Sequence, residues 1–127
     1  MSQKILIVDD EPHIRLLLEQ TLEELEDDGV ELLTAANGKE ALETIQVERP
    51  QLVFLDVMMP IMNGFDVCHT VKQELALSDI FIIMLTAKGQ EFDKQQGADA
   101  GADLYMTKPF DPDEILEKSR KILGLSE

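Results

Sequence analysis

The chain has 127 residues, 44% of them hydrophobic, which is enough for one domain with a full core. Eleven basic against 26 acidic residues give a formal net charge of −15, and this argues against nucleic-acid binding through the chain's own surface. No apolar stretch approaches the roughly 18 residues of a membrane span, and no signal peptide is expected before the strand at Lys4. The lone Cys68 allows no internal disulfide and favours a reducing cytoplasm.

Five short apolar runs alternate with helical patterns along the chain. Runs such as Ile80–Leu85 do not alternate with polar residues, so we expect both faces of each strand to be buried, as in a parallel sheet between two helix layers. The pattern predicts a single doubly wound α/β domain whose βα units are joined by right-handed crossovers. The predicted strands are Lys4–Val8, Glu31–Ala35, Leu52–Leu55, Ile80–Leu85 and Leu104–Met106.

Four of the helical patterns combine an apolar stripe of helical period with a start signal. The start signals are Pro12, Asn37, Asn63 and Asp111, the last followed by Pro112. The stripes are Ile14, Leu17, Leu18, Thr21, Leu22 and Leu25; Ala41, Leu42 and Ile45; Cys68, Val71 and Leu75; and Ile115, Ser119, Ile122 and Leu123. A further helix is expected at about Gln90–Ala100, where Phe92 is the only large apolar residue and little burial would hold the helix in place.

Polar residues follow four of the predicted strands. They are Asp9 and Asp10, Asp56, Thr86 and Lys108. Because the carboxyl ends of parallel strands lie on one edge of a sheet, we expect these side chains to converge there. Three neighbouring carboxylates repel one another, and a hard divalent cation such as Mg²⁺ or Mn²⁺ would offset the repulsion. Since a carboxylate is also a nucleophile towards phosphorus, the pattern predicts a metal-assisted phosphate site with a charge-neutralising lysine.

Over nearly its whole length the chain resembles the receiver domain of two-component response regulators. The matching stretches are Ile7-Val8-Asp9-Asp10-Glu11, Leu55-Asp56-Val57-Met58-Met59-Pro60 with Asn63-Gly64, Leu85-Thr86-Ala87, Ala100-Gly101-Ala102-Asp103-Leu104-Tyr105, and Lys108-Pro109-Phe110. The resemblance implies one receiver domain over residues 1–127, with a flavodoxin-like strand order of 2-1-3-4-5.

The resemblance also implies a phosphorylation-controlled signalling switch of the bacterial type. Asp56 would accept a phosphoryl group from a sensor histidine kinase or a histidine phosphotransfer protein, in a reaction that depends on Mg²⁺. No enzymatic activity is expected beyond self-phosphorylation from small donors and autodephosphorylation. The implied Mg²⁺ ligands are the carboxylates of Asp9, Asp10 and Asp56 and the backbone carbonyl of Met58.

Further residues of the resemblance would pass the signal on. Lys108 would pair with the phosphoryl group, Thr86 would move to bond it, and Tyr105 would turn inward as Thr86 moves. The peptide bond before Pro109 would be cis. The helix at about Gln90–Ala100, the last strand and the last helix would form an output face that controls an effector domain, a target protein or a phosphorylation-dependent homodimer.

Other function classes fit the residues less well. Aspartate-nucleophile phosphatases resembling the haloacid-dehalogenase family carry Asp-x-Asp after the first strand, whereas this chain has Asp9-Asp10-Glu11. A receiver that ignores phosphate and acts only as an interaction module would not need Asp56, Thr86 and Lys108 together. Flavin binding lacks its Ser/Thr/Gly-rich phosphate loop. The end of the chain at Glu127 fits either a stand-alone receiver or the front part of a longer regulator.

Overall fold

The computed structural model describes residues 3–87 and 101–125 of the chain. Within them, five parallel strands form one sheet in the order β2-β1-β3-β4-β5, so the predicted fold and strand order are confirmed. The strands are β1 (Gln3–Val8), β2 (Val30–Ala35), β3 (Leu52–Asp56), β4 (Phe81–Ala87) and β5 (Leu104–Lys108). The helices are α1 (Pro12–Leu22), α2 (Gly38–Glu48), α3 (Gly64–His69) and α5 (Pro112–Leu123). The helix predicted at Gln90–Ala100 lies outside the described residues.

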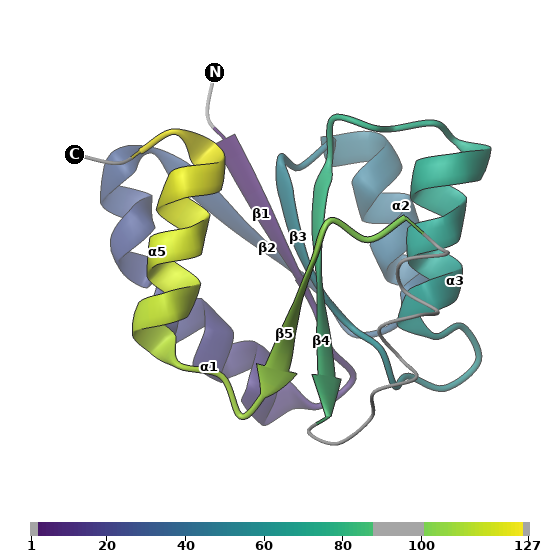
Figure 1. The fold of residues 1–127 in the computed structure, drawn as a ribbon, viewed down its shortest axis with the longest axis horizontal. Helices are drawn as coiled ribbons and strands as arrows, with labels where there is room; N and C mark the ends of the chain where they lie inside the picture. The colour runs from purple at the N-terminus through teal and green to yellow at the C-terminus, as the bar shows by residue number, and fades with distance from the viewer. Residues whose placement is uncertain (1–2, 88–100, 126–127) are drawn as a thin grey trace.

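Helices cover both faces of the sheet, with α1 and α5 on one side and α2 and α3 on the other (Figure 1). Side chains of a strand point alternately to the two faces, so each strand feeds two cores. In β1, Leu6 and Val8 lie in the core under α2 and α3, whereas Ile5 and Ile7 lie in the core under α1 and α5. This double burial explains why the strands are continuous apolar runs.

The predicted start signals of the helices are in place. The Asn37 side chain accepts a hydrogen bond from the Glu40 backbone N–H at 2.9 Å at the start of α2. Asn63 forms a reciprocal capping box with Asp66 at the start of α3. Asp111 caps α5, and proline occupies the first turn of both α1 and α5. Each cap satisfies backbone donors that the first turn would otherwise leave unpaired.

Two residues of the predicted apolar stripes are exposed. Leu17 is 44% exposed, because the inner face of α1 is already formed by Ile14, Leu18 and Leu22. Leu75 is 37% exposed, because α3 widens into a π-helical stretch at Thr70–Glu74. The wider turn rotates Leu75 away from the face begun by Cys68 and Val71.

Two smaller observations complete the fold. The peptide bond between Lys108 and Pro109 is cis, as the sequence predicts. None of the helices within the described ranges combines the length and apolar character that crossing a bilayer requires.

Candidate functional site

Three carboxylates gather at the edge of the sheet where the parallel strands end. One oxygen atom from each of Asp9, Asp10 and Asp56 lies within 4.8 Å of the others. The strands β1 and β3 are neighbours with Val8 opposite Leu55, so the residues that follow these two come side by side. Asp9 is fully buried and Asp56 is 4% exposed, whereas Asp10 is exposed. The cluster therefore has two buried acids and one that solvent reaches.

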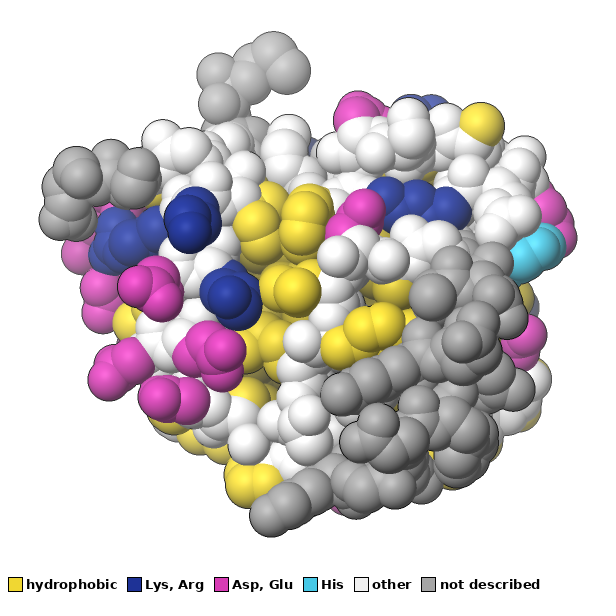
Figure 2. All heavy atoms as spheres, viewed as in Figure 1, with side chains coloured by type: hydrophobic (Ala, Val, Ile, Leu, Met, Phe, Trp, Pro, Cys, Tyr) yellow, Lys and Arg dark blue, Asp and Glu magenta, His cyan; other side chains and the backbone are white. Residues whose placement is uncertain are grey.

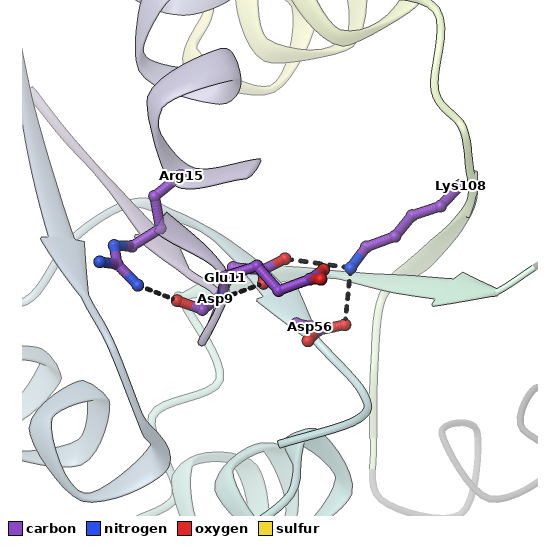
Figure 3. A network of polar contacts seen from close by, with 5 residues as sticks. All are labelled: Asp9, Glu11, Arg15, Asp56 and Lys108. Carbon is purple, nitrogen blue, oxygen red and sulfur yellow. Dashed lines mark hydrogen bonds and ion pairs between the residues drawn. The ribbon is translucent and has the colours of Figure 1, made fainter. Parts of the chain in front are cut away.

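Lys108 bridges the two buried acids. Its Nζ atom lies 3.0 Å from Asp9 Oδ2 and 3.0 Å from Asp56 Oδ1 (Figure 3). Burial lowers the pKa of Lys108, but the hydrogen bond and charge of Asp56, followed by those of Asp9, outweigh this effect and raise the pKa above its ordinary value. The lysine therefore remains a cation at neutral pH and neutralises part of the acidic charge.

The ionised form of Asp56 is disfavoured in the folded protein, so the pKa of its carboxyl group is raised. The pKa of Asp56 is raised to about 6, and burial is the largest cause. The hydrogen bond from Lys108 acts in the opposite direction, while the charge of Asp9 adds to the effect of burial. Desolvation disfavours the ionised form, and here it outweighs the attraction of one lysine. At pH 7 the carboxylate is still mostly ionised, which is the form that can act as a nucleophile.

Asp9 is held in one orientation by the start of α1. Its Oδ1 atom accepts a hydrogen bond from the Glu11 backbone N–H at 2.9 Å, while its backbone carbonyl accepts one from Arg15 Nη1 at 2.6 Å (Figure 3). Arg15 was not among the site residues that the sequence predicted. The signal that could have revealed it is a basic residue four positions after the N-cap Glu11, where the first turn places it beside the loop that precedes the helix.

The remaining predicted residues lie beside this cluster. Thr86 is buried on β4, one residue beyond the partner of Asp56 in the sheet register. Tyr105 of β5 is opposite Met84 of β4, so Tyr105 and Thr86 share the face that α2 and α3 cover. Tyr105 is partly buried against that core. Met58 is exposed in the loop after β3.

The loop between β3 and α3 closes tightly on Asp56. The Gly64 backbone N–H donates to the Val57 carbonyl at 2.9 Å, and the Val57 N–H donates to Leu85 of β4 at 3.2 Å. A side chain at Gly64 would collide with the backbone carbonyl of Asp56, so only glycine allows this approach. The residues Val57–Asn63 thus form a closed loop anchored at the acid cluster.

The chain is similar to known proteins over its whole length. A family model described as "Response regulator receiver domain" matches residues 5–120. The chain is 46% identical to the "Alkaline phosphatase synthesis transcriptional regulatory protein PhoP" of Bacillus subtilis, over 100% of this chain and 51% of that protein. It is 42% identical to the "Phosphate regulon transcriptional regulatory protein PhoB" of Pseudomonas aeruginosa, over 97% of this chain and 52% of that protein. The chain therefore spans about half the length of these curated relatives.

Solved structures agree with this similarity. A putative response regulator from Chloroflexus aurantiacus superposes with a TM-score of 0.84 at 36% identity, covering 98% of this chain and 99% of that one. Chemotaxis protein CheY4 of Vibrio cholerae superposes with a TM-score of 0.83 at 35% identity, covering 96% and 99% of the two chains.

Proposed function

Because the chain belongs to the family of response regulator receiver domains, we propose that its Asp56 is the phosphoacceptor of a signalling switch. The observation that carries the proposal is the position of Asp56 at the end of the central strand. There it lies 3.0 Å from the lysine ammonium group and beside two further acids. The donor is a sensor histidine kinase or a histidine phosphotransfer protein. Receiver domains act as signalling switches, and we infer that this one turns over no substrate beyond small phosphodonors and its own phosphate.

Transfer of the phosphoryl group requires a nucleophile and a cation from the chain's own residues. A carboxylate oxygen of Asp56 attacks phosphorus, the bond between the donor's nitrogen and phosphorus breaks, and the leaving imidazole nitrogen takes up a proton. Asp56 must be ionised for this step, which its pKa of about 6 allows at neutral pH. Lys108, already positioned at Asp56, then pairs with an oxygen of the transferred group.

The charges of the site fit a bound Mg²⁺ ion. Three carboxylates against the single ammonium group of Lys108 leave a formal charge of −2, which a divalent cation balances. Carboxylate oxygens are the hard ligands that Mg²⁺ prefers, and Mn²⁺ accepts them too. Asp10, Asp56 and Asp9, with the backbone carbonyl of Met58, would hold the ion. When bound, Mg²⁺ would neutralise negative charge on the transferring phosphoryl group.

The signal would then pass through Thr86 and Tyr105. Moving a two-state equilibrium from 1:99 to 99:1 takes roughly 5.5 kcal/mol of differential binding. A hydrogen bond to a charged group contributes about 1.5–3 kcal/mol, so Thr86 alone is too weak and must act together with Lys108 and loop amides. Tyr105 shares the sheet face with Thr86 and would turn inward as Thr86 moves.

We infer an output face built from β5, α5 and the predicted helix at Gln90–Ala100. Figure 2 shows hydrophobic side chains gathered over the β5 edge of the sheet, next to basic and acidic side chains of α5. Among the described residues, β5 pairs only with β4 and is the last strand on its side of the sheet. An apolar centre with a charged rim is the anatomy of protein interfaces. A phosphorylation-dependent homodimer, an effector domain or a target protein would dock there.

The relatives suggest what this face controls. PhoP and PhoB are named transcriptional regulatory proteins, and each is about twice as long as this chain. We propose that an effector segment beyond the receiver contacts DNA in such a regulator, since the net charge of −15 opposes direct contact by the receiver itself. The setting would be the cytoplasm, where kinases and their phosphodonor ATP are present.

The test is labelling with acetyl phosphate in Mg²⁺, read as intact mass. The wild-type protein should gain one phosphate, and Asp56→Asn should gain none because the amide is no nucleophile. Asp79→Asn removes an exposed acid outside the cluster and serves as the matched control, with wild-type labelling expected. Addition of EDTA should abolish the reaction. Labelling of the wild type at another residue would remove Asp56 from its role, and full labelling in EDTA would contradict the Mg²⁺ site.

A further inference from the structure

The start of α2 touches the loop that follows the phosphoacceptor strand. Gly38, the first residue of α2, is buried against Met62. A Cβ atom at position 38 would lie 2.7 Å from the Met62 carbonyl oxygen and 2.9 Å from the Met62 Cβ, closer than such atoms approach one another. Gly38 is not among the glycines with positive φ, so its backbone does not require glycine. The space beside Met62 does.

Helix formation gives no reason for glycine at this position. Asn37 already caps α2, and nearly every other residue forms helices better than glycine does. Glycine also loses the most conformational entropy on folding. Glycine at position 38 therefore lowers the stability of the helix locally, but it allows a close approach between α2 and the loop Val57–Asn63.

The tip of that loop is strained. The Met62 N–H donates to the Pro60 carbonyl at 2.7 Å, and Ile61 between them has φ 70°, which together define a γ-turn of the rare positive-φ kind. A β-branched residue is disfavoured in this region, and such turns persist only where neighbouring structure imposes them. The Ile61 side chain is fully exposed and so contributes no packing of its own. Met62 is the residue of the turn that the rest of the molecule contacts, because it is partly buried beside Gly38 and against the core under α2 and α3.

We propose that Gly38 is a positioning residue for the phosphoacceptor site, acting through Met62 on the loop that carries Met58. The proposal rests on the proposed function, in which the Met58 carbonyl is a ligand of Mg²⁺. The base of the loop is closed by the hydrogen bond from Gly64 to Val57, and its tip is closed by the contact between Gly38 and Met62. Because both the base and the tip of the loop are held, Met58 between them has little freedom to reorient.

A side chain at position 38 would act on the loop rather than on the helix. Helix α2 is held by its cap and by Ala41 and Ile45 in the core, so it resists displacement. The backbone of Ile61, by contrast, lowers its conformational energy when φ changes from positive to negative. Displacement of Met62 by a side chain at position 38 would therefore open the turn. The loop then loses its closed tip, and the Met58 carbonyl loses its fixed direction.

The experiment compares Gly38→Ala with Lys39→Ala, an exposed substitution at the next residue of the same helix. The first measurement is amide hydrogen exchange of Gly64 in metal-free protein, with the Leu6 amide of β1 as internal reference. The second is the dissociation constant for Mg²⁺ alone, from calorimetric titration. In Gly38→Ala we expect Gly64 to exchange about tenfold faster and Mg²⁺ to bind about tenfold more weakly, the lower end of the loss caused by removing outer support of metal ligands. Lys39→Ala should match the wild type in both.

A second variant keeps the test decisive if Gly38→Ala fails to fold. Met62→Ala shortens the other partner of the contact and leaves α2 unchanged, and it should shift both measurements in the same direction as Gly38→Ala. Wild-type exchange and wild-type Mg²⁺ affinity in these variants would overturn the proposal. Faster exchange with unchanged Mg²⁺ affinity would overturn it too, because the loop would then move without effect on the site. Absence of Mg²⁺ binding by the wild type would instead refute the proposed function, and the exchange of Gly64 would still decide whether Gly38 closes the loop.

Discussion

Two ion-pair groups in this molecule share one arrangement, a cation that pairs with two carboxylates, and they differ in burial. Lys108 bridges Asp9 and Asp56 at the carboxyl edge of the sheet, with both acids almost fully buried. Arg120 of α5 bridges Glu24 and Asp28 of the 3₁₀ helix Glu23–Asp28, with the acids 58% and 41% exposed. Water screens the second cluster, whereas it reaches the first only at the partly exposed Lys108. We therefore expect the buried cluster to govern stability and chemistry, and the exposed cluster to affect neither strongly.

The largest effect should come from removing the cation of the buried cluster. Lys108→Met leaves two buried carboxylates uncompensated, and breaking a buried pair in this way costs about 3–5 kcal/mol. We expect the lower end of that range, because Lys108 keeps some solvent contact. Urea denaturation at pH 7.5 in EDTA measures the change. A loss as small as that of a surface substitution would mean that water reaches the acids.

Removing an acid of the same cluster should have the opposite sign. The pKa of Asp56 rises from 3.8 to about 6, so its ionised form destabilises the folded state by roughly 2–3 kcal/mol, at about 1.4 kcal/mol per unit. Asp56→Asn resembles the neutral acid and should stabilise the metal-free protein by about that amount at pH 7.5. The midpoint of urea denaturation reports it, and a destabilised variant would show that the ion pair with Lys108 outweighs burial.

The pH dependence of this difference follows from the same pKa. The folded protein holds the Asp56 proton more tightly than the unfolded chain does, so the stability that this proton confers is present below about pH 4. It is lost as the pH rises towards about 6 and is absent above that value. Wild type and Asp56→Asn should therefore be nearly equal in stability at pH 4 and diverge up to pH 7. A difference that is constant across this range would exclude Asp56 titration as its cause.

The smallest effect should come from the exposed cluster. Arg120→Met removes the cation between Glu24 and Asp28, and the change in unfolding free energy should stay within the scatter of ordinary surface substitutions. Any residual change should vanish in 0.5 M NaCl, where screening is strong. Denaturation at low and high salt gives the comparison, and a salt-independent loss as large as that of Lys108→Met would erase the distinction between the clusters.

Much of the fold followed from local patterns. The apolar runs marked all five strands to within two residues at each end, and Asn37, Asn63 and Asp111 marked helix starts. Leu17 and Leu75 belong to the predicted apolar stripes but are exposed in the structure. A periodic stripe does not show where neighbouring elements end their cover, nor that α3 widens into a π-helical stretch.

The residues of the site likewise fall into those that the sequence predicted and those that only the structure revealed. The position of Asp9, Asp10 and Asp56 after predicted parallel strands was enough to expect them at one edge. The role of Arg15 was open to prediction from its place in the first turn of α1, whereas the contact of Gly38 with Met62 depends on the path of a loop in space rather than on a pattern along the chain.

The sequence by itself determined the strands, the helix starts and the edge at which the acids meet, because these depend on side-chain periodicity and on the direction of parallel strands. Only the tertiary structure decided that Lys108 reaches across β4 to residues 99 and 52 positions away, which of the acids are buried, and how far burial raises the pKa of Asp56. Those properties depend on strand order, register and the exclusion of water, and they arise only when all the layers are packed together.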